Sequence, residues 1–203
     1  VFRGFENVGD DYGMIMAVLG GDDAGGGVIW APHVLEAAQA HGLVLGDNGR
    51  LYDSKRGETL PAGVVPMPPL AESELEAFPE LTASEVVPHF VKRYWDLMAM
   101  AADGPCRVIG DGALIHDRPG FDVDFVSRGS LDGAYHVDTP EVLMGMRGHW
   151  RLTVDGQDTL INPGDTVLVD AGTERTLVPA VSGEASLYRV RPTNDPAGPT
   201  LGF

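Results

Sequence analysis

Short strand-like runs, each bounded by Gly, Pro or Asp, dominate the chain from about residue 106 onward. Eight such runs follow one another up to residue 192: CRVIG, FDVDFVSRG, GAYHVD, EVLMGMRG, HWRLTVDG, QDTLINPGD, TVLVDAG and RTLVPAVSGEASLYRVRP. Strands this short, separated by frequent turns, are typical of all-β domains. The sequence therefore predicts an antiparallel barrel or jelly roll over residues 106–192.

The segment before this β-region has a different pattern. After the Gly-rich stretch GGDDAGGG at 20–27, a short helix is predicted, because Pro32 suits a first helical turn and Gly42 suits a helix end. The Pro-rich stretch PAGVVPMPPL at 61–70 then predicts an extended connector. This part of the chain is expected to be linker.

A second helix is predicted to begin at Thr82, which forms a capping box with Glu85. Pro88 should kink this helix or mark its true start. We therefore expect residues 21–105 to form a helical and Pro-rich linker, and residues 193–203 to form a C-terminal tail.

The charge and the cysteine content restrict the partners. The formal net charge is -16, from 30 acidic and 14 basic residues, so the chain should repel nucleic-acid backbones and anionic lipid surfaces. Its apolar runs are too short to cross a bilayer. The one cysteine, Cys106, cannot form a disulfide within the chain, which fits a cytoplasmic protein.

The stretch from Ala134 to Leu177 is similar to the two sequence motifs of the cupin family. In the first motif, a pair of alternating histidines is followed by a glutamate and then a glycine. Here His136 takes the second histidine position, Glu141 follows after four intervening residues, and Gly148 follows after six more.

The second cupin motif fits further along the chain. Gly164 is followed by five residues and then by Asp170 in the proline position, by Gly172, and, after two more residues, by Arg175 in the histidine position. The resemblance covers residues 106–192. It implies a mainly β protein with a cupin jelly-roll barrel, preceded by the helical linker and by an N-terminal β-hairpin.

In a metal-binding cupin, three histidines and a glutamate hold iron, manganese, nickel or zinc. The four positions here are Ala134, His136, Glu141 and Arg175. Alternate residues of a strand face the same side, so positions 134 and 136 are expected to point into the barrel. Two of the four ligands are missing, and a guanidinium cannot bind a cation. We therefore do not expect the transition metal in this barrel.

Three interpretations of these positions stay open. Arg175 and Glu141 can form a buried ion pair in place of the metal. Arg175, with His136 and Tyr135, can instead bind the carboxylate or enolate of a small ligand, because an Arg fork matches such anions. A reduced metal site of His136 and Glu141, with Asp138, is the third possibility.

The start of the chain, VFRGFENVGDD, fits the second cupin motif again. Arg3 stands in the histidine position and Asn7 follows at the required distance, so the start repeats the region around Arg175 at a constant offset. We expect residues 1–20 to be the terminal strands of a preceding cupin barrel that this chain lacks. The alternative is an added hairpin on a single barrel. Either hairpin must pair with another element, since an isolated one is marginally stable.

This layout resembles the bicupins, which have two cupin barrels joined by a linker. The resemblance implies a non-haem metal-dependent dioxygenase acting on a small aromatic or dicarbonyl substrate, with the metal outside the barrel at 106–192. The alternative is a non-catalytic cupin that binds a small anionic ligand or serves as a structural or oligomerisation module. Expected partners are a small-molecule ligand, another cupin barrel and further copies of the chain.

Overall fold

The computed structural model describes residues 5–18, 30–78, 82–113, 115–116, 120–129 and 133–193. The chain forms two compact units. The first comprises Val1–Ile15, Gly21–Thr82 and Thr200–Phe203, and the second comprises Met16–Gly20 and Ala83–Pro199.

The first unit contains one helix, one hairpin and two short helical turns. Its elements are α1 (Pro32–Ala40), β1 (Leu43–Leu45), β2 (Leu51–Asp53), η1 (Ser54–Arg56) and α2 (Glu72–Leu75). α1 begins at Pro32 and is followed by Gly42 with a φ of 84°, which matches the predicted helix limits. The β1–β2 hairpin was not predicted. Its turn contains the pair Asn48-Gly49, with Gly49 at a φ of 78°, a typical hairpin signal.

Residues 5–18 contain the turn of the expected N-terminal hairpin but no strand. Asn7 Oδ1 accepts a hydrogen bond of 3.1 Å from the Gly9 amide, and Asn7 Nδ2 donates to the Asp11 carbonyl at 2.6 Å. The side chains around the turn are exposed. Arg3, the Gly-rich stretch at 20–27 and the C-terminal tail from residue 194 lie outside the described residues.

The second unit begins with two helices, α3 (Ala83–Phe90) and α4 (Tyr94–Met100). The sequence predicted one helix, either kinked at Pro88 or beginning there. The interruption instead falls at residues 91–93, and Pro88 lies within α3. Arg93 is extended, with φ and ψ of -79° and 145°, and its carbonyl accepts the first backbone bond of α4, from Leu97 at 3.0 Å. The chain therefore starts a new helix at Tyr94.

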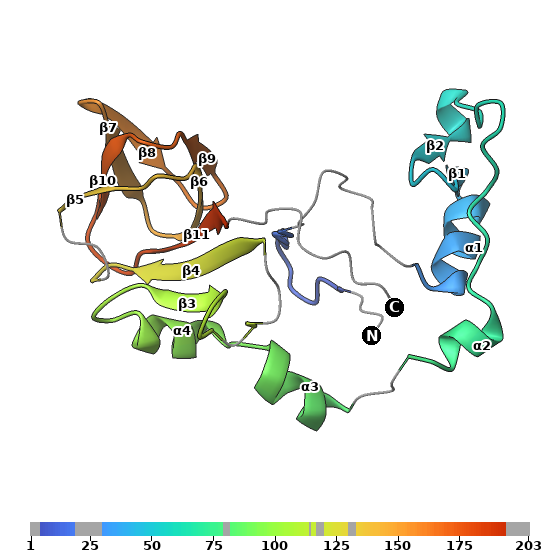
Figure 1. Ribbon diagram of the computed structural model, residues 1–203, viewed down its shortest axis with the longest axis horizontal. Coiled ribbons are helices and arrows are strands. Elements are labelled where there is room, and N and C mark those ends of the chain that lie inside the picture. Colours follow the sequence, from blue (N-terminus) through green and yellow to red (C-terminus); the bar gives the residue numbers. More distant parts are fainter. Residues whose placement is uncertain are drawn as a thin grey trace. The chain divides into compact units, whose positions relative to one another are not determined.

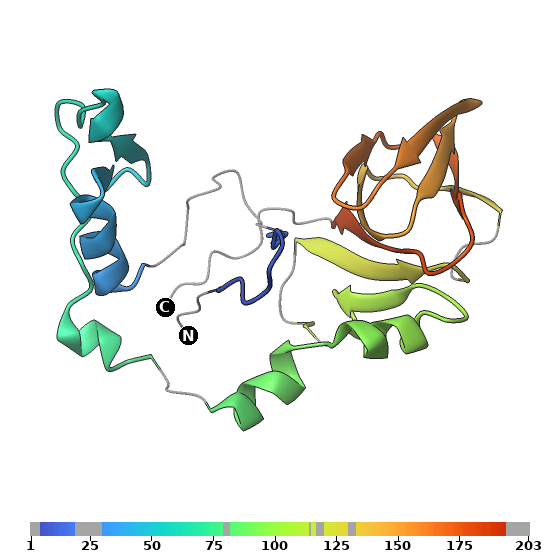
Figure 2. The same ribbon diagram turned by 180° about the vertical axis from the view of Figure 1, so that it is seen from behind.

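In the part of the second unit that the structure describes, nine strands form two antiparallel sheets that face each other (Figures 1 and 2). The four-stranded sheet has the order β5-β10-β7-β8 and the five-stranded sheet the order β3-β4-β11-β6-β9. Their bounds are β3 (Cys106–Ile109), β4 (Phe121–Ser127), β5 (Ala134–His136), β6 (Glu141–Arg147), β7 (Trp150–Val154), β8 (Gln157–Ile161), β9 (Thr166–Val169), β10 (Glu174–Pro179) and β11 (Ser186–Pro192).

The order of the strands is that of a jelly roll. Most neighbours in each sheet are not consecutive in the chain, so the chain crosses repeatedly between the sheets, as in double-sheet jelly rolls. The mainly β jelly-roll fold predicted from the sequence is confirmed. The last of the eight predicted runs is two strands, β10 and β11, separated by a turn at Ala180–Glu184.

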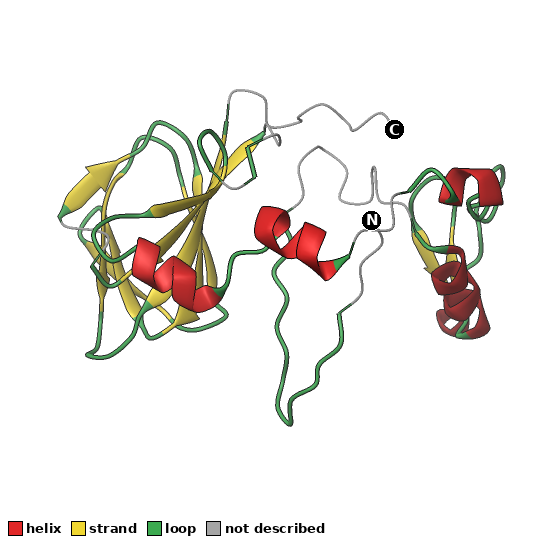
Figure 3. Ribbon diagram, turned by 90° about the horizontal axis from the view of Figure 1, so that it is seen from below, coloured by secondary structure: helices red, strands yellow, loops and turns green. Residues whose placement is uncertain are grey.

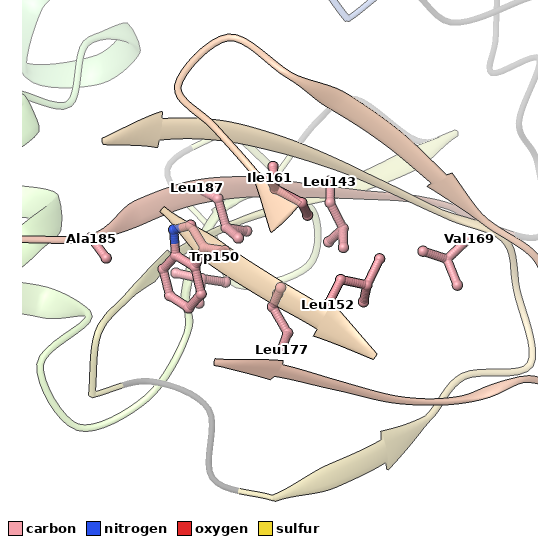
Figure 4. Close-up of a cluster of buried hydrophobic side chains, with 9 residues drawn as sticks. Leu143, Trp150, Leu152, Ile161, Val169, Leu177, Ala185 and Leu187 are labelled. Atoms are coloured by element: carbon pink, nitrogen blue, oxygen red, sulfur yellow. The ribbon is translucent and has the colours of Figure 1, made fainter. Parts of the chain in front are cut away.

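The space between the sheets holds the larger hydrophobic core. Its buried side chains come from both sheets, and Figure 4 shows them spread between the strands, with the fully buried Trp150 toward one end. The cluster comprises Val126, Leu143, Trp150, Leu152, Ile161, Val169, Leu177, Ala185 and Leu187. Burial of such apolar area is the main force that holds two sheets together.

A smaller core lies on the outer face of the five-stranded sheet, where α4 covers β3 and β4 (Figure 3). Leu97 and Ala101 pack on Cys106 and Phe125. Ser127 on β4 donates a hydrogen bond to the Ala101 carbonyl at 2.6 Å. α4 is thereby fixed to the barrel by apolar burial and by a polar contact at its end.

The turn between β8 and β9, residues 162–165, docks closely on Gly145 of β6. The Gly145 amide donates to the Asp165 carbonyl at 3.0 Å, and the Gly164 amide donates to the Gly145 carbonyl at 2.8 Å. A Cβ at Gly145 would collide with the carbonyl oxygen of Asn162. The absence of a side chain here is a packing requirement.

We therefore expect Gly145→Ala to lower the free energy of unfolding by about 1–3 kcal/mol, the usual cost of overpacking. Gly104→Ala is the matched control, because a Cβ at Gly104 would meet no atom within 4 Å. That variant should stay within about 0.5 kcal/mol of the parent. Urea unfolding measures both, and equal midpoints for the two variants would contradict the packing argument.

Candidate functional site

The carboxylate of Glu141, at the start of β6, lies at the centre of the site. The residue is 0% exposed. Its Oε1 accepts a hydrogen bond of 2.8 Å from the Tyr135 hydroxyl and lies 3.5 Å from Arg175 Nη1. Its Oε2 accepts a bond of 2.7 Å from Arg191 Nε and lies 3.7 Å from Arg189 Nε. One carboxylate thus lies within ion-pair distance of three guanidinium groups.

The ion pairs continue across the inner face of the five-stranded sheet. Arg189 Nη2 donates to Asp124 Oδ2 at 2.9 Å, Arg107 donates to the other oxygen of Asp124, and Arg107 Nη1 lies 2.6 Å from Asp122 Oδ2. We call the whole set the interior charge network: Arg107, Asp122, Asp124, Tyr135, Glu141, Arg175, Arg189 and Arg191.

Strand register explains why these charges meet. On β11 and β4, Arg189 lies directly opposite Asp124, and Arg191 directly opposite Asp122. Paired residues of an antiparallel sheet share a face, so each cross-strand pair brings opposite charges together. Arg189 is also on the same face as the core residue Leu187, two positions earlier, which places its guanidinium inside the barrel.

Arg175, on β10, uses every guanidinium nitrogen within the protein. Its side chain is 0% exposed. Besides the contact with Glu141, its Nε donates to the Thr173 carbonyl at 3.3 Å, and its Nη2 donates to the carbonyls of Asp170 at 3.1 Å and Thr173 at 3.2 Å. The geometry agrees with the ion-pair interpretation of Arg175 and Glu141.

Tyr135 completes the network from β5. The guanidinium carbons of Arg175 and Arg189 lie 5.7 and 5.8 Å from its ring centroid, within cation–π distance. Burial raises the pKa of the Tyr135 hydroxyl well above its usual value, and the adjacent carboxylate of Glu141 raises it further. The hydroxyl therefore stays protonated and donates to Glu141.

The predicted direction of β5 is wrong. Tyr135, and not its neighbours, points into the barrel, since it pairs with the buried Arg175. His136 pairs with Glu174 on the outer face, its side chain is 53% exposed, and its Nδ1 lies 3.5 Å from Asp138 Oδ1. Ala134 is exposed too. An inward Tyr buries a large ring and places its hydroxyl beside a partner, whereas an inward His136 would enter a site already rich in cations.

The residues at the cupin metal positions do not fit a metal ion. Glu141 is the one anionic donor of the predicted set inside the barrel, and three guanidinium groups surround it, so a further cation would be repelled. His136 points away from Glu141, to the opposite face of β5. Across the described residues, no group of three His, Cys, Asp or Glu side chains is arranged to hold a metal.

A small hollow opens on the outer side of the four-stranded sheet. It has a volume of about 130 Å³ and is lined by Thr153, Asp155, Gly156, Glu174, Arg175 and Thr176. Small-molecule sites usually have a volume of about 300–1,000 Å³. The hollow is too small for a substrate, and the guanidinium of Arg175 is turned inward, away from solvent.

Sequence reasoning found Glu141, Arg175 and Tyr135 but missed the partners on β4 and β11. The signal was present as a matched alternation: acids two apart in FDVDFV and bases two apart in LYRVRP. Charges at the same period on two strands are expected to pair if the strands are neighbours. That these two strands are neighbours was not predictable from spacing, because β4 and β11 lie far apart in the chain.

Several solved structures resemble the barrel. A cupin-2 domain protein from Shewanella frigidimarina is 17% identical, with 53% of this chain and 99% of that chain covered and a TM-score of 0.39. An RmlC-like cupin from Methanocaldococcus jannaschii is 16% identical, covering 36% and 70%, with a TM-score of 0.34. A cupin superfamily protein from Desulfitobacterium hafniense is 15% identical, covering 37% and 69%, with a TM-score of 0.32.

At these identities the likeness is one of fold, and it does not confirm a two-barrel arrangement. No family model matches the sequence, and no curated protein matches it. Among the helices of the described residues, none combines the length and apolar character that a bilayer crossing requires.

Replacing Glu141 tests the interior charge network. We expect Glu141→Gln to lower the free energy of unfolding by about 3–5 kcal/mol, because it leaves buried guanidinium groups without a counter-charge. Glu184→Gln is the matched control, since Glu184 pairs with Arg147 at 3.3 Å where both side chains are about half exposed. That change should cost less than about 1 kcal/mol. Chemical denaturation measures both, and a small loss for Glu141→Gln would contradict a structural role.

The raised pKa of Tyr135 predicts a loss of stability in alkali. A tyrosine in the unfolded chain loses its proton near pH 10, its ordinary pKa, whereas folded Tyr135 keeps it. The contribution of the protonated Tyr135 hydroxyl to the free energy of unfolding is therefore complete below pH 10 and is lost as the pH rises above 10. Tyr135→Phe should make stability fall less steeply above pH 10. Tyr12→Phe, at a fully exposed tyrosine, should leave the slope unchanged. If stability falls equally steeply above pH 10 in the two variants, the loss of stability in alkali does not come from Tyr135.

Proposed function

We propose that the barrel is a non-catalytic structural module whose interior charge network occupies the place that a metal or ligand takes in other cupins. The observation that carries this proposal is the buried Glu141 carboxylate, bonded to Tyr135 and surrounded by three guanidinium groups. Three of the roughly four lone-pair sites of this carboxylate already accept hydrogen bonds from the protein, and the surrounding guanidinium groups oppose the approach of a cation.

The dioxygenase activity implied by the bicupin resemblance is not assigned to this barrel. A non-haem metal site needs imidazole and carboxylate ligands with open positions for substrate. Arg175 stands in one histidine position, and His136 lies on the outer face. If the intact protein is such an enzyme, the proposal gives this barrel a supporting role beside the catalytic one.

Binding of a small anion at Arg175, the other prediction from the sequence, has less support. An incoming carboxylate would have to displace Glu141 and break the bonds from Arg175 to the carbonyls of Asp170 and Thr173. The interior charge network has four arginines against three acids. The charge inside the barrel therefore opposes an added anion less than an added cation. However, the guanidinium donors of Arg175 that would bind the anion already bond to protein acceptors.

The test is metal and ligand binding by the purified chain. Elemental analysis should find no stoichiometric iron, manganese, nickel or zinc, and adding these ions, or oxalate at matched ionic strength, should not raise the melting temperature. A ligand that binds the folded state alone must raise it. Metal bound one to one, and lost in Glu141→Gln, would overturn the proposal in favour of a metal site.

Two controls make a positive result interpretable. His136→Ala removes an exposed imidazole, so metal binding that disappears in this variant would belong to the outer face and not to the barrel interior. An oxalate-induced rise in melting temperature that disappears in Arg175→Lys would overturn the proposal in favour of anion binding, because Lys keeps the charge but loses the planar fork.

A further inference from the structure

The chain contains two lysines, and an arginine follows each of them directly. The two pairs are Lys55-Arg56 and Lys92-Arg93, in a chain with 14 basic and 30 acidic residues. Endoproteases that cut after basic residues hold the cationic side chain in a pocket with an acidic group at its base. All four side chains are exposed, so access to such a pocket does not distinguish the two pairs. The conformation of the backbone does.

The backbone at Lys92-Arg93 is open and extended. Residues 91–93 form the interruption between α3 and α4, belong to no helix or strand, and are exposed. Arg93 has φ and ψ of -79° and 145°. In the part of the chain that the structure describes, the amides of Lys92 and Arg93 donate no hydrogen bond to another backbone group. An extended segment with available backbone groups can pair with a protease as an added strand.

The backbone at Lys55-Arg56 is closed by hydrogen bonds. The pair lies in the helical turn η1, where the Lys55 amide donates to Asp53 Oδ1 at 2.9 Å and the Gly57 amide donates to the Ser54 carbonyl at 3.1 Å. Arg56 Nε also lies 3.4 Å from Asp53 Oδ2. A protease reaches a peptide bond in such a turn after the turn opens, and opening has a free-energy cost. The two basic pairs therefore differ in the accessibility of the backbone.

The hydrogen bonds of α4 favour a cut after Lys92 over a cut after Arg93. The Arg93 carbonyl accepts the first backbone bond of α4, from the Leu97 amide at 3.0 Å, so attack on this carbonyl would disturb the start of the helix. No backbone amide of the described residues donates to the Lys92 carbonyl. On its other side the chain is held by a single end-of-helix bond from the Val91 amide to the Val87 carbonyl, at 3.2 Å, and helix ends open easily.

The contacts that fix α4 to the barrel lie C-terminal to this bond. The Tyr94 hydroxyl lies 3.0 Å from Ser186 Oγ on β11, and the hydroxyl of Ser127 on β4 donates to the Ala101 carbonyl. The buried side chains of α4 belong to the smaller core. A cut before Arg93 therefore leaves α4 on the barrel and separates both from the preceding part of the chain.

We propose that the peptide bond between Lys92 and Arg93 is a processing site for an endoprotease that cuts after basic residues. The protease hydrolyses the bond with one water molecule, so that Lys92 gains a carboxylate and Arg93 gains an amino group. The products are the segment that ends at Lys92 and the barrel with α4. This inference goes beyond the structural role of the interior charge network and does not rest on it.

The test is limited digestion of the full chain with a lysine-specific endoprotease, followed by mass spectrometry of the products. Because the chain has two lysines, the enzyme chooses between two bonds. The bond after Lys92 should be cut at least about tenfold faster than the bond after Lys55. Lys92→Gln should abolish the faster cut, and Lys55→Gln, the matched control, should be cut like the parent. Equal rates at the two lysines, or faster cutting after Lys55, would overturn the proposal.

Unfolding separates the effect of the structure from that of the local sequence. In urea the two bonds should be cut at similar rates, because the turn that holds Lys55 is then open. A preference for Lys92 that is unchanged in urea would overturn the proposal. Circular dichroism should show that the product beginning at Arg93 keeps a cooperative thermal transition, and a product that unfolds on cleavage would count equally against it.

Discussion

The buried carboxylate of Glu141 joins the two sheets of the barrel through polar contacts to both. Glu141, Arg189 and Arg191 belong to the five-stranded sheet, whereas Tyr135 and Arg175 belong to the four-stranded sheet. Elsewhere the sheets are held together by apolar packing around Trp150 and its neighbours. Apolar packing tolerates small sliding of one sheet on another, but directed bonds to one carboxylate fix their relative position.

The balance of charge inside the barrel depends on the arginine at position 175. Its guanidinium places a permanent cation beside Glu141. Glu141 then serves as counter-ion and not as ligand. A buried pair costs desolvation energy, and it is stable when further bonds satisfy the remaining donors, as the carbonyls of Asp170 and Thr173 do for Arg175.

The sequence predicts the fold better than it predicts the site. Turn residues and strand period are local, so they indicate the jelly roll and leave the pairing of Glu141 with Arg175 as one of three interpretations. The direction of β5 fails for a physical reason: a shift of one residue moves every side chain to the other face, and motif spacing alone does not fix it. The register with β10 fixes which side chains of β5 point inward, because it sets Tyr135 opposite Arg175. Arg189 and Arg191 need the long-range pairing of β4 with β11.

The inner face of the five-stranded sheet combines apolar core residues with buried charges, whereas the side chains of β11 that face outward are uncharged. Along β11, Arg189 and Arg191 face the barrel interior, while Tyr188 and Val190 face outward. The inner charges are stable because each has a partner across a strand or across the barrel. The outer residues have no such compensation unless protein covers them, as α4 covers Tyr188. The alternation that turns Arg189 and Arg191 inward therefore also turns Tyr188 and Val190 outward, so the buried ion pairs and the uncharged outer side chains of β11 follow from one strand pattern.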